Sequence, residues 1–175
     1  MPILGGVGGG STITGLNFEK ETDILTLLQN TEGYSVRESV IYYEEKEVAR
    51  SMKKNALYVY LASRGVDYKT ILSKKLLPDE AIYVIINNTL FVIEVKFQQV
   101  AGSVDEKLQT CDFKRKQYAK LMAPLNIEVE YIYILSDWFR DIKYKDTLDY
   151  IISVGCQYYF KYLPLQKLGL PVPNK

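Results

Sequence analysis

The stretch that decides the fold is PDEAIYVIINNTLFVIEVK, residues 78–96. It holds two apolar runs, residues 81–86 and 90–95, and only the second is interrupted, by Glu94. The pair Asn87–Asn88 lies between them, and asparagine tolerates the positive φ angles of a tight two-residue turn. The stretch therefore predicts a β-hairpin. Apolar residues on both faces of both strands indicate a central sheet that is covered on both sides.

The same hairpin carries charged residues at its open end. If the two asparagines form the turn, Asp79 lies opposite Lys96. Directly opposed residues share a face, and side chains alternate along each strand. Asp79, Glu94 and Lys96 are therefore expected on one face, with Gln98 continuing it if the strand persists, and Glu80 on the other.

Two acids and a lysine at the end of an apolar strand have two interpretations. The first is a structural ion pair, because burying charges without partners is costly. The second is a divalent-cation site, because carboxylate and carbonyl oxygens are the ligands that Mg²⁺ and Mn²⁺ prefer.

The rest of the chain predicts an α/β domain with a mixed central β-sheet flanked by helices. Residues 1–15 are expected to form a flexible glycine-rich leader. Residues 16–175 are expected to form one domain, with a helical insertion at about 44–77. The strand–helix–strand order after the hairpin implies a parallel connection. The further expected elements are helices at 16–30, 45–63, 103–123 and 145–154 and strands at 34–43, 127–135 and 156–160.

The composition excludes several kinds of catalytic and metal site, but it does not indicate a class of partner. The chain has 175 residues, a net charge of +1, no histidine and two cysteines. These counts exclude Ser-His-Asp and Cys-His triads and a four-cysteine zinc site. No apolar run reaches the roughly 18 residues of a membrane span, and no signal peptide is evident. We therefore expect a cytoplasmic protein that does not act at a membrane.

The charged residues of the hairpin resemble the sequence motif of a known protein family. Pro78-Asp79, fourteen residues and then Glu94-Val95-Lys96 is similar to the signature of the PD-(D/E)xK nuclease superfamily. The string Gly15-Leu16-Asn17-Phe18-Glu19 resembles the opening of the helix that supplies a further acid in many of these nucleases. The order of expected elements also resembles the restriction-endonuclease-like αβββαβ core. The resemblance covers roughly residues 15–135. After the motif, Gln98-Gln99 and Gly102-Ser103 resemble the corresponding part of small type II restriction endonucleases most.

The resemblance implies a role for each matching residue. Asp79 and Glu94, with the carbonyl of Val95, would hold Mg²⁺, for which Mn²⁺ would substitute, and Glu19 would reach the same ion. Lys96 would position or deprotonate the attacking water, and Gln98 would assist. The expected contacts to DNA are Gln99, Ser103, Lys107, Lys114 and Lys116.

The implied function is sequence-specific cleavage of double-stranded DNA to 5′-phosphate ends by a homodimer. A cognate DNA methyltransferase would belong to the same system without being a physical partner. Two alternatives remain open. One is a structure-specific nuclease, such as a Holliday-junction resolvase or a repair nuclease, and the other is a non-catalytic DNA-binding protein.

Overall fold

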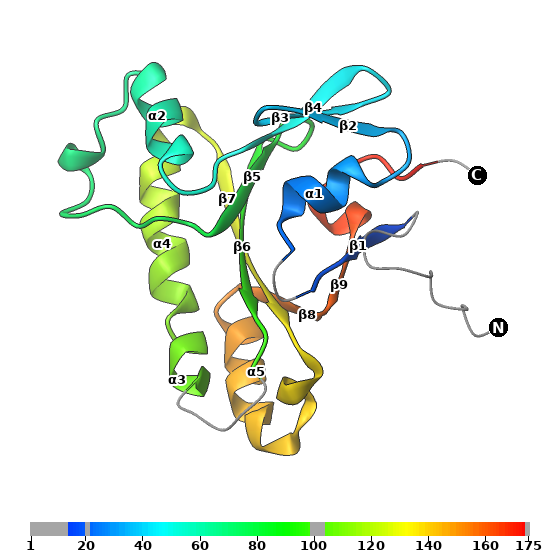
Figure 1. The fold of residues 1–175 in the computed structure, drawn as a ribbon. Coiled ribbons are helices and arrows are strands. Elements are labelled where there is room, and N and C mark those ends of the chain that lie inside the picture. Colours follow the sequence, from blue (N-terminus) through cyan, green and yellow to red (C-terminus); the bar gives the residue numbers. More distant parts are fainter. Residues whose placement is uncertain (1–13, 20–21, 99–103, 174–175) are drawn as a thin grey trace.

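A computed structural model describes residues 14–19, 22–98 and 104–173 of the chain. They form a seven-stranded mixed sheet with strand order β2-β3-β4-β5-β6-β7-β8 and a separate two-stranded ribbon of β1 and β9 (Figure 1). The sheet strands are β2 (Tyr34–Arg37), β3 (Val40–Tyr43), β4 (Lys46–Ser51), β5 (Glu80–Val84), β6 (Thr89–Lys96), β7 (Glu128–Leu135) and β8 (Gln157–Phe160). The ribbon joins β1 (Gly15–Asn17) to β9 (Tyr162–Pro164).

Helices cover both faces of the sheet. The α-helices are α1 (Ile24–Gln29), α2 (Ala56–Ser63), α3 (Val104–Leu108), α4 (Cys111–Met122) and α5 (Lys145–Ser153). The described residues also form five short 3₁₀ helices: η1 (Tyr68–Thr70), η2 (Ala123–Leu125), η3 (Asp137–Arg140), η4 (Ile142–Tyr144) and η5 (Leu165–Leu168). Residues of α2, α4 and α5 pack on one face, and residues of α1, the ribbon and η5 pack on the other (Figure 1). The expected mixed sheet flanked by helices is confirmed.

Strand β6 connects the two cores because its side chains alternate between them. Leu90 and Val92 are buried on the α4 face, and Phe91 and Ile93 are buried on the α1 face. Its neighbours are antiparallel β5 and parallel β7, so the expected parallel connection through the helix is confirmed.

The expected pairing of the hairpin strands is wrong by two residues, because the turn is longer than predicted. Val84 pairs with Thr89 across a four-residue turn, and Glu80 pairs with Ile93. A two-residue turn of type I′ needs two positive φ angles, whereas only Asn88 of the two asparagines has one, at 51°. Because side chains alternate with a period of two, a slip of two residues leaves every side chain on its expected face.

The expected helix at 16–30 is wrong in its first half. Leu16 lies in β1, and the helix begins only at Ile24, where the Asp23 carboxylate accepts a hydrogen bond of 2.8 Å from the Thr26 N–H. Asp23 is therefore the N-cap of α1 and not part of its first turn. Glu19 lies between the ribbon and this cap and does not belong to a helix.

Three other expected elements are divided in the structure. The strand expected at 34–43 is the hairpin β2–β3, and the helix expected at 45–63 is β4 followed by α2. The helix expected at 103–123 is interrupted at 109–110 between α3 and α4. The region 44–77 therefore contains β4, α2 and η1 and is not wholly helical. Most of the expected leader lies outside the described residues, but Gly15 already belongs to β1.

Over the described residues, no helix combines the length and apolar character that a membrane crossing requires.

Ile132 tests the core that this sheet creates. It lies in β7 with no exposed surface, so Ile132→Ala should lower the free energy of unfolding by about 2–5 kcal/mol. Ile152 on α5 is 55% exposed, and Ile152→Ala should change stability by no more than about 0.5 kcal/mol. Urea denaturation of both variants measures the difference. Equal effects would contradict the burial described here.

Candidate functional site

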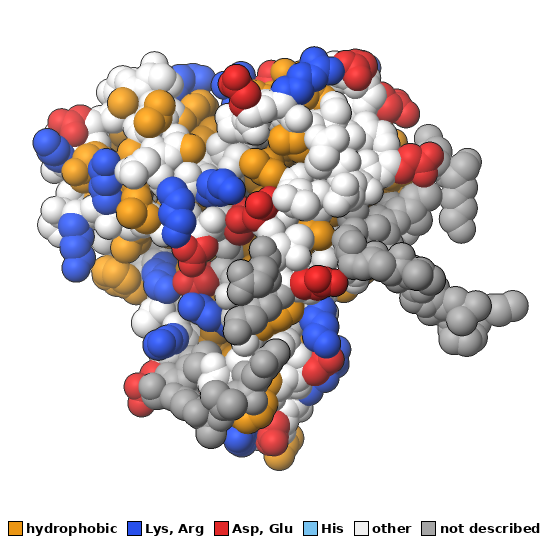
Figure 2. Space-filling view, viewed as in Figure 1, with side chains coloured by type: hydrophobic (Ala, Val, Ile, Leu, Met, Phe, Trp, Pro, Cys, Tyr) orange, Lys and Arg blue, Asp and Glu red, His pale blue; other side chains and the backbone are white. Residues whose placement is uncertain are grey.

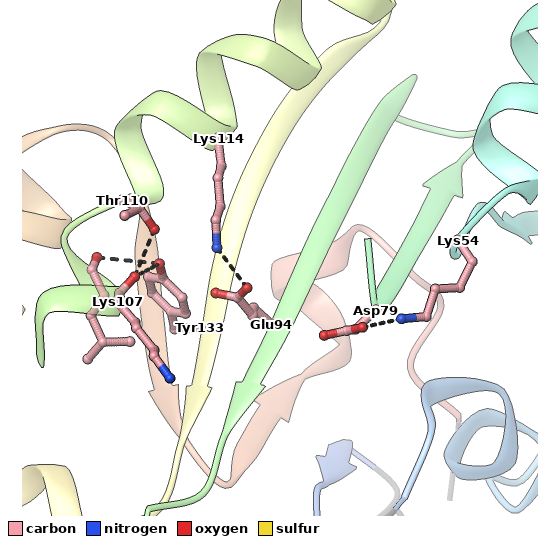
Figure 3. Close-up of polar contacts among 8 residues, drawn as sticks. Lys54, Asp79, Glu94, Lys107, Thr110, Lys114 and Tyr133 are labelled. Carbon is pink, nitrogen blue, oxygen red and sulfur yellow. Dashed lines mark hydrogen bonds and ion pairs between the residues drawn. The ribbon is translucent and has the colours of Figure 1, made fainter. Parts of the chain in front are cut away.

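The open end of the β5–β6 hairpin brings two acids to one face of the sheet. The β5–β6 ladder ends at Glu80 and Ile93, and one further step in this register puts Asp79 opposite Glu94. The register predicted from the sequence instead puts Lys96 opposite Asp79. Both carboxylates lie on the α4 side of the hairpin (Figure 3).

Asp79 and Glu94 line a common cavity of about 90 Å³ between the hairpin and α4. Residues of the segment that precedes β5 and of β6, α4 and β7 complete its wall: Leu76, Leu77, Pro78, Val92, Ile93, Lys114, Tyr118 and Tyr131. The cavity is therefore mostly apolar, with two carboxylates and one ammonium group as its charged members. Lys96 does not line it.

Glu94 is the more buried of the two acids, with 14% of its side chain exposed. Its Oε1 is 3.0 Å from Nζ of Lys114, which reaches it from α4 (Figure 3). Its Oε2 is buried and has no hydrogen-bond partner among the described residues. Leaving such an oxygen unsatisfied costs free energy, so this atom needs an explanation.

Tyrosines surround Glu94. Burial, followed by the negative charge of Glu94, raises the pKa of Tyr131 and Tyr133 far above the usual value for a phenol. Burial raises the pKa of Tyr118 as well, and the nearby carboxylates of Glu94 and Asp79 add to this effect. These phenols therefore stay protonated at any physiological pH, so they are unsuited to act as bases.

Asp79 is more exposed and has a different partner. Its carboxylate forms an ion pair with Lys54, from the turn that precedes α2 (Figure 3). The backbone fixes this approach, because the Lys54 N–H donates a hydrogen bond of 2.7 Å to the carbonyl of Pro78. The two acids of the motif are thus each paired with a lysine from outside the hairpin.

The remaining expected ligands and catalytic residues do not line this cavity. Among the described residues, no acid is within ion-pair distance of Lys96, which ends β6. The side chain of Val95 packs on the α1 face. Gln98 lies beyond the end of β6, and its carbonyl accepts a hydrogen bond of 3.1 Å from Ser136. Within the described part of the chain, no three acids or cysteines gather as a metal-ligand set, so Glu19 does not complete one with Asp79 and Glu94.

The expected DNA contacts divide into three groups. Gln99 and Ser103 lie outside the described residues. Lys107 is exposed on α3, and Lys116 on α4 lies 3.0 Å from Asp112. Lys114 is not a freely exposed lysine, because it is the partner of Glu94. No sequence pattern predicts this pairing, because it depends on how α4 lies against the sheet.

Glu80 is a further unusual acid, and it lies on the opposite face as expected. It is only 8% exposed, and its Oε2 also has no hydrogen-bond partner among the described residues. Burial raises its pKa to about 7; Asp23 adds to the rise, while Lys53 and a hydrogen bond from the Ile24 N–H oppose it. Sequence reasoning missed this property because the covering residues belong to α1.

Comparisons of the chain with protein-family models, with curated proteins and with solved structures found no match.

Glu80 makes stability depend on pH in a defined direction. Its pKa rises from 4.5 in the unfolded chain to about 7 in the folded protein, so the folded state binds the proton more tightly. Stability should therefore fall as the pH rises from about 4.5 to 7 and should be level above that range. Glu80→Gln should remove this fall, which is on the order of 2–3 kcal/mol.

Chemical denaturation at several pH values measures this effect, with the exposed acid Glu32 as a control. Glu32→Gln should keep the dependence of the wild-type protein. If the wild-type protein and Glu80→Gln have parallel pH profiles, Glu80 is not the group responsible.

Proposed function

We propose that this protein is a Mg²⁺-dependent endonuclease that cleaves double-stranded DNA, of the restriction-endonuclease-like kind that its motif resembles. The observation that carries the proposal is the pair Asp79 and Glu94 on the wall of one cavity, with a buried oxygen of Glu94 that lacks a partner among the described residues. A hard cation would satisfy that oxygen, whereas a purely structural ion pair leaves it unexplained.

The donor set fits such an ion. Mg²⁺ is commonly held by one or two carboxylates together with water and substrate phosphates, so a third acid is not required. Asp79 and Glu94 would hold it, with the carbonyl of Val95. When bound, the ion would lower the pKa of a water molecule and stabilise negative charge on a phosphate.

The protein's own residues would do the remaining work. Lys96 would orient the attacking water, whose oxygen forms the new bond to phosphorus while the bond from phosphorus to the 3′ oxygen breaks. The water gives up one proton, and the leaving 3′ oxygen takes up one. The products would be a 5′-phosphate and a 3′-hydroxyl. Gln98, two residues beyond the end of β6, would contact the phosphate.

The surface charge around the acids suits a polyanion. Lysine and arginine side chains gather on the face formed by α2 and α4, around a few acidic groups (Figure 2). Exposed lysines come from several segments on this side of the sheet: Lys54, Lys74, Lys75, Lys107 and Lys116. Such a distribution attracts a DNA backbone toward this face.

The order of elements from β5 onward supports the proposal. The β5–β6 hairpin is followed by α3 and α4 and then by β7, which runs parallel to β6. This is the second half of an αβββαβ arrangement, with the acids at the end of the hairpin. Cleavage of both strands of a palindromic site by one active site per chain would require a homodimer.

Digestion of phage DNA tests the proposal directly. With Mg²⁺ or Mn²⁺ the protein should give discrete fragments with 5′-phosphate ends, and a chelator should abolish cleavage. Asp79→Asn and Lys96→Ala should each reduce the cleavage rate on the order of 100-fold or more, because a metal ligand and a charge-stabilising group each contribute several kcal/mol. Glu32→Gln, which removes an exposed carboxylate elsewhere, should cleave normally.

Other outcomes identify the alternatives. Cleavage of branched DNA without discrete fragments from linear DNA would indicate a structure-specific nuclease. DNA binding without cleavage in either metal would indicate a non-catalytic protein. Undiminished cleavage by both variants would contradict the assignment of the site.

A further inference from the structure

The acids of the candidate site are already neutralised by side chains of the protein itself. Lys114 from α4 pairs with Glu94, and Lys54 from the turn before α2 pairs with Asp79 (Figure 3). Neither lysine belongs to the sequence motif, and each comes from an element that packs against the hairpin.

The Lys114 pair is the more consequential of the two. The side chains of Lys114 and Glu94 are 30% and 14% exposed, whereas those of Lys54 and Asp79 are 56% and 65% exposed. Water and salt screen an exposed pair strongly, so the Lys54 pair is weak. The Lys114 pair lies at the wall of the cavity, where removal of one partner leaves the other charge poorly solvated.

The Lys114 ammonium group occupies only one oxygen of Glu94. Its Nζ lies 3.0 Å from Oε1, and Oε2 is the buried atom without a partner among the described residues. A divalent cation on this carboxylate would lie within a few ångströms of the ammonium group. Two positive centres at that separation repel strongly in a partly buried site.

We propose that Lys114 and a divalent cation compete for Glu94, so that Lys114 is a positioning residue that holds the carboxylate until the cation displaces it. This inference rests on the proposed function, because it concerns the same acids. The Lys114 side chain is 30% exposed and has a long flexible stem, so its ammonium group can turn from the cavity toward solvent. A DNA phosphate beside the bound cation is the anion that would receive it.

The competition makes an unusual prediction about binding. Lys114→Met keeps most of the apolar stem but removes the ammonium group, so this variant should bind Mn²⁺ about fivefold more tightly than the wild-type protein. The same variant should cleave DNA more slowly, because the phosphate loses its partner. A merely structural role for Lys114 would weaken both properties together.

Electron paramagnetic resonance of free Mn²⁺, titrated with the full chain in the absence of DNA, measures the affinity. Lys116→Met is the matched control, since Lys116 lies on the same helix but is 64% exposed and pairs with Asp112. It should bind Mn²⁺ like the wild-type protein. Lys114→Arg, which keeps the charge, should not show the gain, and Glu94→Gln should bind Mn²⁺ more weakly.

The outcomes separate this inference from the proposed function. If Glu94→Gln weakens Mn²⁺ binding but Lys114→Met binds no more tightly than the wild-type protein, the competition is refuted and the metal site stands. If no variant shows Mn²⁺ binding that depends on Glu94, both proposals are overturned.

Discussion

The alternation of side chains along β6 is the constraint on which the rest of the structure depends. Both faces of this strand are covered, so its apolar side chains enter two cores in alternation. Up to Ile93 every side chain is suited to burial, and Glu94 is then the first that is not. Alternation directs this carboxylate toward α4, into a space where tyrosine rings limit access of water.

A carboxylate in that position needs compensation, and its neighbours supply it from other parts of the chain. Lys114 is placed by the packing of α4 on β7, and Lys54 by a backbone hydrogen bond to Pro78. Lys96, which the expected register puts opposite Asp79, belongs to neither of these ion pairs. Two lysines that the motif does not include determine the electrostatic state of its acids.

Local patterns were sufficient to predict the elements with the strongest apolar runs. The strands β5, β6 and β7 follow from such runs, and α5 ends before Gly155 as expected. The face of the sheet on which Asp79 and Glu94 lie was predictable even though the predicted turn was wrong. Side chains alternate with a period of two, so a register shift of two residues leaves each on the same face. The β3–β4 turn was not predictable, since Glu44 and Glu45 both adopt positive φ angles that the sequence gives no reason to expect. The partners of the acids were also beyond reach, because they depend on how distant segments pack.

The ribbon of β1 and β9 carries a consequence for how the molecule assembles. The α1 face is closed by pairing Gly15–Asn17 with Tyr162–Pro164 and by the leucines of η5. A nascent chain that has emerged only as far as β8 therefore has only α1 to cover this apolar side of its sheet. Contacts between residues so far apart in the sequence form late. This side of the sheet is therefore the part of the molecule that most needs shielding from aggregation during synthesis.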